Sequence, residues 1–248
     1  MQPLIVISGC FFFMHKFFVS ILFSLFFLWD LPGNAQYNYV PNPGFEEYDS
    51  IPQYNADSSV FFYLYFAKYW FNPVNCGYCN YFNSDLNYLD TLDVPNQYAV
   101  PQNPWSNTYP YEGTAMSAFC PFEVTANLNA GHRNYLEVKL KDPLVGGKKY
   151  CVRFFITLMD TSYIAVDQLG VFFSYSSVTH YATNPPFYLL VNPQIVSPEG
   201  EYFNIRYKWQ EVSGTYTALG GERYLTVGNF NVDSGTPYEW LTDNSNYG

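Results

Sequence analysis

Charged side chains are scarce in this sequence. Asp, Glu, Lys and Arg make up 13% of the 248 residues, against ~25% in typical soluble domains. Only 11 Lys and Arg oppose 21 Asp and Glu, which gives a net charge of −10. A surface with this balance repels phosphate backbones, so we expect no nucleic-acid partner.

Motifs that carry catalysis are also lacking. Of the three histidines, only His132 and His180 lie beyond the leader described below, and neither has a metal-binding spacing. No Gly-x-Ser-x-Gly nucleophile elbow occurs. The carboxylates that a glycoside hydrolase would pair, Glu46–Glu47 or Asp90 and Asp93, do not stand out, so a polysaccharide hydrolase is a minority alternative. We expect no catalytic residues and no enzyme activity.

The sequence has no convincing amphipathic helix, whereas aromatic residues reach 21%. Tyr and Phe favour strands, and Tyr, with an apolar ring and a polar hydroxyl, suits a sheet that exposes one face to solvent. Pro and Gly divide the chain into short β-prone runs, with a loop-rich stretch at 72–113. This pattern predicts an all-β jelly-roll β-sandwich with long loops. The strands we expect lie at 60–66, 114–119, 135–140, 149–158, 165–174, 203–212 and 222–230.

The first 35 residues resemble a signal peptide rather than part of the fold. A short positive region at 14–16 precedes an apolar run over 17–29. Small residues follow at Gly33 and Ala35, as a cleavage site requires. We therefore predict an exported protein of the cell surface, the outer membrane or the medium.

The boundaries follow from this leader. Met14 is the better start, Gln36 begins the mature chain, and one domain spans 36–248. Two alternatives stay open. The apolar run could be a transmembrane anchor, although it is short for a membrane span, which needs ~20 residues. The chain could also be a lipoprotein, because Ile7–Cys10 resembles a lipoprotein cleavage box, although no Lys or Arg precedes it.

Four cysteines remain after leader removal: Cys76, Cys79, Cys120 and Cys151. An even number in an exported chain is typical of disulfides, and four cysteines allow three pairings that the sequence leaves open. The plausible choice is Cys76–Cys79 as a loop clamp and Cys120–Cys151 between strands. A redox or zinc role for the Cys-x-x-Cys spacing is weak, because no βαβ pattern and no second ligand pair surround it.

Aromatic residues in the loops are candidate ligand contacts. Trp105 lies in a proline-bounded loop, flanked by Tyr109 and Tyr111, and these rings could stack on a sugar. Trp70 is a further candidate. Aromatic residues of sandwiches more often belong to the core, and we expect this of Trp209, which lies in a predicted strand.

Glu46 and Gly113 are candidate calcium ligands. Phe45 would enter the core while Glu46 faces a loop end, and carbonyls near Gly113 could add oxygen ligands. Calcium prefers carboxylate and carbonyl oxygens from several loops. The alternative, which we weigh equally, is that Glu46 caps a turn or pairs with Lys or Arg.

Several segments, in order, resemble a group of exported bacterial surface proteins. Such modules often precede an OmpA-like peptidoglycan-binding domain or a secretion-sorting domain. The group is in turn similar to the galactose-binding-like jelly roll of carbohydrate-binding modules. That resemblance implies a structural calcium held through a Phe-Glu pair, which carries over to Glu46 and more loosely to Gly113. The segments lie at 40–48, 67–73, 81–83, 135–140, 144–152 and 218–230.

Together these observations predict a non-catalytic binding or adhesion module for a glycan or a cell-envelope component. The oligomeric state stays open. The alternative is a structural spacer or assembly module ahead of an OmpA-like or sorting domain. The polar end from Asp233, in which we expect no closing strand, favours a chain truncated from a longer protein.

Overall fold

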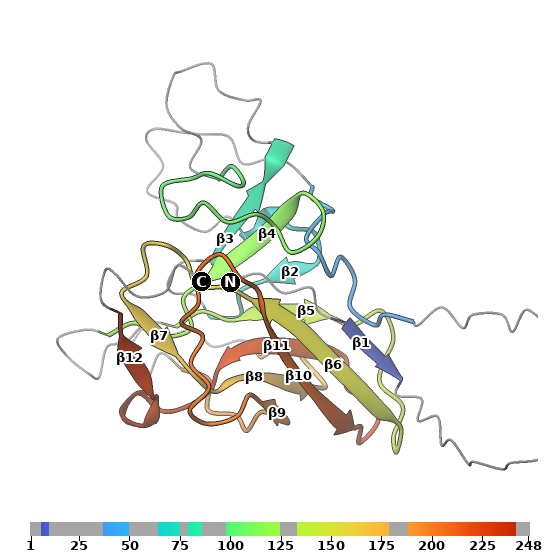
Figure 1. Cartoon of the computed structure of the whole chain (residues 1–248). Helices are drawn as coiled ribbons and strands as arrows, with labels where there is room; N and C mark the ends of the chain where they lie inside the picture. The colour runs from blue at the N-terminus through green and yellow to red at the C-terminus, as the bar shows by residue number, and fades with distance from the viewer. Residues whose placement is uncertain are drawn as a thin grey trace, which may run out of the picture.

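The computed structural model describes residues 6–9, 37–49, 64–74, 79–85, 98–124, 133–178 and 188–241. This part of the chain is dominated by antiparallel strands (Figure 1). Helical structure there consists of short 3-10 turns such as η1 (Leu64–Phe66) and η3 (Asp233–Gly235). Across these described residues, no helix has the length and apolar character to cross a membrane.

Two larger sheets and two strand pairs make up the fold. The first sheet runs in the order β1 (Val6–Gly9), β6 (Lys149–Ile156) and β10 (Gln210–Thr217). The second runs in the order β2 (Trp70–Phe71), β5 (Leu136–Lys139), β11 (Tyr224–Asn229), β8 (Leu169–Ser174) and β9 (Ile195–Val196). The strand pairs are β3 (Cys79–Asn83) with β4 (Ala115–Phe119), and β7 (Ile164–Val166) with β12 (Tyr238–Trp240).

The two larger sheets pack face to face over one apolar core. Phe173 of β8 stacks on Tyr216 of β10, with ring centroids 4.9 Å apart. Gly214 of β10 lies so close to Ile195 of β9 that a β-carbon would meet its side chain at 2.6 Å. The all-β sandwich class predicted from the sequence is therefore confirmed, while the finer jelly-roll assignment stays a prediction.

Strand β6 behaves as its sequence indicates. Phe154, Phe155 and Ile156 are all buried, so this end of the strand is covered on both faces. Strand β6 pairs with β10 on one edge and with β1 on the other. Strand β1 lies inside the predicted leader and pairs with β6 from Val6↔Arg153 to Gly9↔Tyr150. Residues 10–36, with the predicted cleavage site, lie outside the described part.

Three strand predictions need correction. Residues 64–66 form η1 instead of a strand, and 60–63 lie outside the described residues. The run 165–174 is broken at Gln168, whose positive φ of 52° turns the chain, so β7 and β8 join different sheets. The segment 203–209 precedes β10 rather than forming it.

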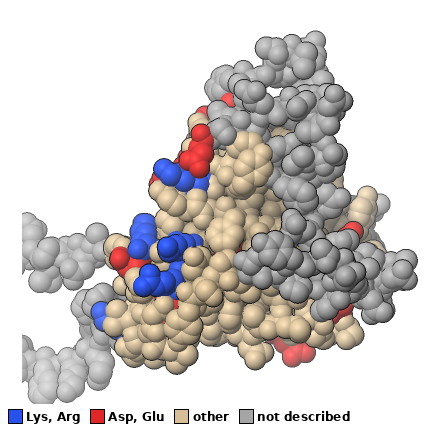
Figure 2. All heavy atoms as spheres, turned by 180° about the vertical axis from the view of Figure 1, so that it is seen from behind, with Lys and Arg blue, Asp and Glu red and all other residues tan. Residues whose placement is uncertain are grey.

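The end of the chain also differs from expectation. Tyr238–Trp240 forms β12 and pairs with β7, where no closing strand was expected. The strand escaped notice because it has three residues, of which only Tyr238 and Trp240 are strong β-formers. The described part of the face seen in Figure 2 is mostly uncharged, as the composition implies, and its Lys and Arg gather toward one side.

Candidate functional site

Loop 101–114 carries most of the predicted ligand contacts, and side-chain hydrogen bonds hold it in place. Buried Asn103 accepts the N–H groups of Trp105 and Ser106, each at 3.0 Å. Asp160 accepts the N–H of Asn107 at 2.9 Å. An Asn side chain that binds its own turn in this way fixes local geometry. The rings on this loop are therefore anchored to the sandwich.

The outer side of the loop forms what we call the aromatic face: Tyr109, Tyr111, Phe155 and Trp209. Tyr111 stacks on Phe155 of β6 with centroids 3.8 Å apart and planes 11° apart. Trp209 meets Tyr111 edge-on at 6.1 Å and donates its indole N–H to the carbonyl of Tyr109 at 3.2 Å. Tyr109 is joined to these rings through its backbone carbonyl, and the residue is 71% exposed.

Such a face can bind without bond chemistry. Tyr and Trp give rigid contact area with a polar edge and lose little conformational entropy on binding. The guanidinium carbon of Arg153 lies 5.4 Å from the Phe155 ring, so a charged donor borders the face. Ring stacking plus polar contacts at the edge is what this arrangement offers a ligand.

The predicted contacts are only partly brought together. Tyr109 and Tyr111 belong to the aromatic face, whereas Trp105 is half-buried and packs against Phe82 and Tyr98 at 6.1 and 5.8 Å. Trp70 must be removed from the candidates: it is 2% exposed in the core, where its size and apolar surface place it. Its indole N–H is satisfied by the Asn42 carbonyl at 2.8 Å.

Sequence reasoning also missed two tryptophans. Trp209 was expected in the core but is half-exposed, because it precedes β10 instead of lying within a strand. Trp240 is 65% exposed on β12. The signal for Trp240 was the alternation Tyr238-Glu239-Trp240, which is typical of a short half-buried strand.

Beneath Trp105 lies a cleft of about 380 Å³. Its walls come from the β3–β4 strand pair, segment 120–122 and segment 158–166. Four polar residues line it: Asn80, Cys120, Thr161 and Ser162. The other lining residues are apolar: Trp105, Ala118, Phe119, Pro121, Phe122, Leu158, Met159, Ile164 and Val166.

Most polar groups of the cleft bond within the chain. The hydroxyls of Thr161 and Ser162 donate to the carbonyls of Trp105 and Ile164 at 3.3 and 2.8 Å. Among the side-chain oxygens that line this cleft, the buried Oδ1 of Asn80 has no hydrogen-bond partner. This oxygen has almost no exposed surface, and a buried acceptor without a partner costs free energy.

Cys120 contributes a neutral thiol to the cleft. Burial, with a smaller contribution from Glu123, raises the pKa of Cys120 to about 11. Its Sγ–H donates to the Phe122 carbonyl at 3.3 Å. Cys120 is a free thiol, so the predicted Cys120–Cys151 bridge is not formed. The two residues come from a loop edge and from β6, which the spacing of the sequence could not place.

The other predicted pairing, Cys76–Cys79, involves Cys76, which lies outside the described residues. The Sγ of buried Cys79 lies 3.7 Å from the Tyr135 carbonyl oxygen. Cys79 is not in a disulfide, so the predicted Cys76–Cys79 clamp is not formed.

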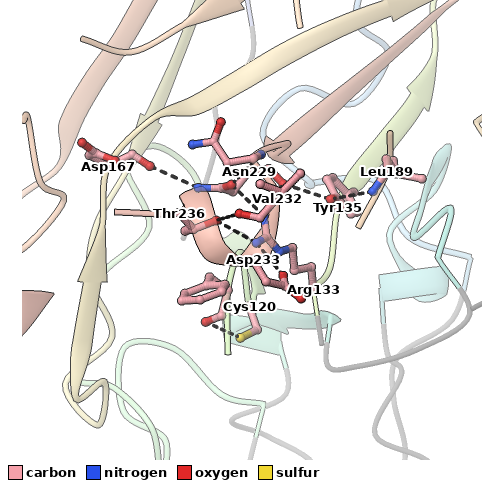
Figure 3. A network of polar contacts seen from close by, with 11 residues as sticks. Cys120, Arg133, Tyr135, Asp167, Leu189, Asn229, Val232, Asp233 and Thr236 are labelled. Atoms are coloured by element: carbon pink, nitrogen blue, oxygen red, sulfur yellow. Dashed lines mark hydrogen bonds and ion pairs between the residues drawn. The ribbon is translucent and has the colours of Figure 1, made fainter. Parts of the chain in front are cut away.

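Near Cys120, the buried Arg133 lies in a network of polar contacts with Asn229, Asp233 and Thr236 (Figure 3). Arg133, 0% exposed, lies with its guanidinium carbon 4.9 Å from the Phe122 ring centroid. It pairs with Asp233 at 2.8 Å and donates to Thr236 and Asn229 at 2.7 and 2.8 Å. Its charge is thus neutralised behind Phe122 and is not presented to the cleft.

Glu46 and Gly113, the predicted calcium ligands, lie next to each other. The carboxylate of Glu46 accepts three hydrogen bonds: from the N–H of Thr114 at 3.0 Å, from the hydroxyl of Thr114 at 2.7 Å and from the N–H of Ala115 at 3.2 Å. Hydrogen-bond donors rather than further oxygen ligands surround the carboxylate, which fits the capping alternative. Across the described parts of the chain, no three His, Cys, Asp or Glu side chains cluster as a metal site would require.

Comparisons with known proteins add no relative: no protein-family model, no curated protein and no solved structure matches this chain.

Proposed function

We propose that this chain is an exported, non-catalytic module that binds a glycan or another cell-envelope component through its aromatic face. The observation that carries the proposal is the ring cluster of Tyr111, Phe155 and Trp209, which is joined to the loop at the backbone carbonyl of Tyr109, a residue that is 71% exposed. A sugar ring presents C–H groups to such faces and hydroxyl groups to bordering polar side chains, so stacking and hydrogen bonds act together.

A glycan array and pull-down with isolated cell envelope test this proposal. We expect at least one saturable ligand, and loss of most of that binding in Tyr109→Ala and Tyr111→Ala. Tyr175→Ala is the matched control, because Tyr175 is 58% exposed and lies beside Gly221, at the opposite end of β10 from Trp209. Binding to no glycan and no envelope fraction would favour the spacer or assembly alternative.

Trp105→Ala separates the face from the cleft. Because Trp105 packs against Phe82 and Tyr98 and not on the aromatic face, its loss affects glycan binding less than loss of Tyr109. The larger effect for Trp105 would move the glycan site to the cleft.

Export has its own test. N-terminal sequencing of the secreted protein is expected to begin at Gln36. Removal of residues 1–35 also removes β1 and opens one edge of β6. A secreted chain that begins at Met1 would contradict the export proposal.

A further inference from the structure

We propose that the cleft beneath Trp105 is a second binding site, for an uncharged, largely apolar small molecule that donates one hydrogen bond. This inference does not depend on the aromatic face. It rests on the volume of the cleft, on the absence of charge from its lining and on one unpartnered acceptor.

The volume suits a ligand of two fused or linked rings, or a short hydrocarbon chain. Ligand pockets typically measure about 300–1,000 Å³, and an apolar cavity of about 150 Å³ admits benzene. At about 380 Å³, the cleft exceeds the space needed for a single ring.

The lining selects against charge. Among the described residues that line the cleft, none is Asp, Glu, Lys, Arg or His, and the thiol of Cys120 stays protonated because its pKa is raised to about 11. Arg133 lies behind Phe122 and is already paired with Asp233. An ionised ligand would therefore lose its hydration without gaining a counter-charge.

Asn80 sets the polar requirement. Its Oδ1 is buried at the cleft and accepts no hydrogen bond, whereas the hydroxyls of Thr161 and Ser162 already donate within the chain. Oδ1 has almost no exposed surface, so a ligand N–H or O–H reaches it only when the Asn80 side chain turns toward the cleft, and that contact removes the cost of the orphan acceptor. An acceptor-only ligand gains nothing there.

Three dyes with one skeleton test these requirements on the full chain. N-phenyl-1-naphthylamine is neutral, carries one N–H and fluoresces when it leaves water. Its N-methyl derivative lacks the donor, and 8-anilino-1-naphthalenesulfonate adds a negative charge. We expect saturable binding of the first dye, about threefold to tenfold weaker binding of the N-methyl dye, and still weaker binding of the sulfonate.

Variants locate the site. Met159→Trp and Ile164→Trp, both at half-exposed positions of the lining, fill the cleft and are expected to abolish dye binding. Asn80→Leu is expected to keep dye binding but to erase the preference for the N–H dye. Circular dichroism and urea unfolding confirm that each variant is folded, and Tyr109→Ala serves as the control that retains binding.

Each arm can fail separately. No saturable fluorescence with the neutral dye, or unchanged binding in both folded filling variants, would overturn the site. Equal affinity for the N-methyl dye would overturn the donor requirement, and equal or tighter binding of the sulfonate would overturn the selection against charge.

Discussion

The carboxylate of Glu46 fills the space that a side chain at position 113 would need. A β-carbon built on Gly113 would overlap both the carboxyl carbon and Oε1 of Glu46. Gly113 also has a positive φ of 68°, which glycine adopts without strain. The contact joins two segments far apart in the sequence and explains why glycine is needed at the point where loop 101–114 enters β4.

Gly113→Ala is expected to destabilise the fold by more than backbone strain alone. The positive φ costs about 1–2 kcal/mol for a residue with a β-carbon, and displacement of the Glu46 carboxylate adds roughly 1 kcal/mol or more. Urea unfolding measures the change. Gly147→Ala is the control, because Gly147 has a φ of 76° and nothing within 4 Å of its β-carbon position. Equal losses in the two variants would contradict the role of Glu46.

The capping role of Glu46 predicts a calcium-independent effect. Glu46→Ala removes the acceptor for Thr114 and Ala115 and is expected to cost about 1 kcal/mol. Because donors surround the carboxylate, this loss is expected to be the same in calcium and in excess EDTA. A fall in melting temperature of the wild-type protein on chelation, absent in Glu46→Ala, would instead establish the calcium site implied by the resemblance.

How far the sequence alone leads can be judged from particular residues. From the sequence we predicted Phe45 in the core and Glu46 at a loop end, and both predictions are confirmed, although the segment is a turn in which Phe45 has a positive φ of 65° and not an alternating strand. The sequence also located β4, β5, β6 and β11 to within two residues at each end.

It could not place residues whose surroundings come from distant segments. The Trp70 ring is covered by the segment at Asn42 and Phe45, with the Phe45 centroid 4.9 Å away. The cleft combines parts of the chain more than 80 residues apart, from Asn80 to Val166. Periodicity describes local facing, whereas such contacts depend on how the sheets come together.

Loss of the buried arginine is expected to be severely destabilising. Arg133→Met removes the partner of Asp233 and the donors to Asn229 and Thr236, and it leaves a largely buried carboxylate unpaired. Breaking a buried pair from one side costs about 3–5 kcal/mol. Urea unfolding is expected to show a loss in this range for Arg133→Met and a much smaller one for exposed Lys141→Met. A loss below about 1 kcal/mol would show that the network contributes little.

Glu222 is expected to make stability depend on acid. Burial acts to raise its pKa, but hydrogen bonds from the Tyr216 hydroxyl and from the N–H groups of Leu219 and Gly220 outweigh burial, so the pKa of Glu222 is lowered. A carboxylate whose pKa is lower in the folded state stabilises the protein at pH values above its unfolded-state pKa. This stabilisation is lost as the pH falls through the folded-state pKa. Urea unfolding from about pH 6 to pH 3 is expected to show a steeper loss for wild type than for Glu222→Gln.

Glu137 provides a contrast of opposite sign. Burial dominates there and raises the pKa of Glu137, despite hydrogen bonds from Thr226 and Val178. Its contribution therefore declines as the pH rises from the unfolded toward the folded pKa, and Glu137→Gln removes that decline. Parallel pH profiles for wild type and both variants would contradict these assignments.

The most direct test of the account follows the tryptophan indole N–H signals by NMR while a glycan identified on the array is added. The account predicts that the Trp209 signal, whose N–H bonds to the Tyr109 carbonyl at 3.2 Å, shifts in proportion to binding. It predicts that the signal of Trp240, an exposed ring that would also respond to a ligand bound beside it, does not shift. A shift confined to Trp240, or saturable binding that leaves Trp209 unchanged, would contradict a glycan site on the aromatic face.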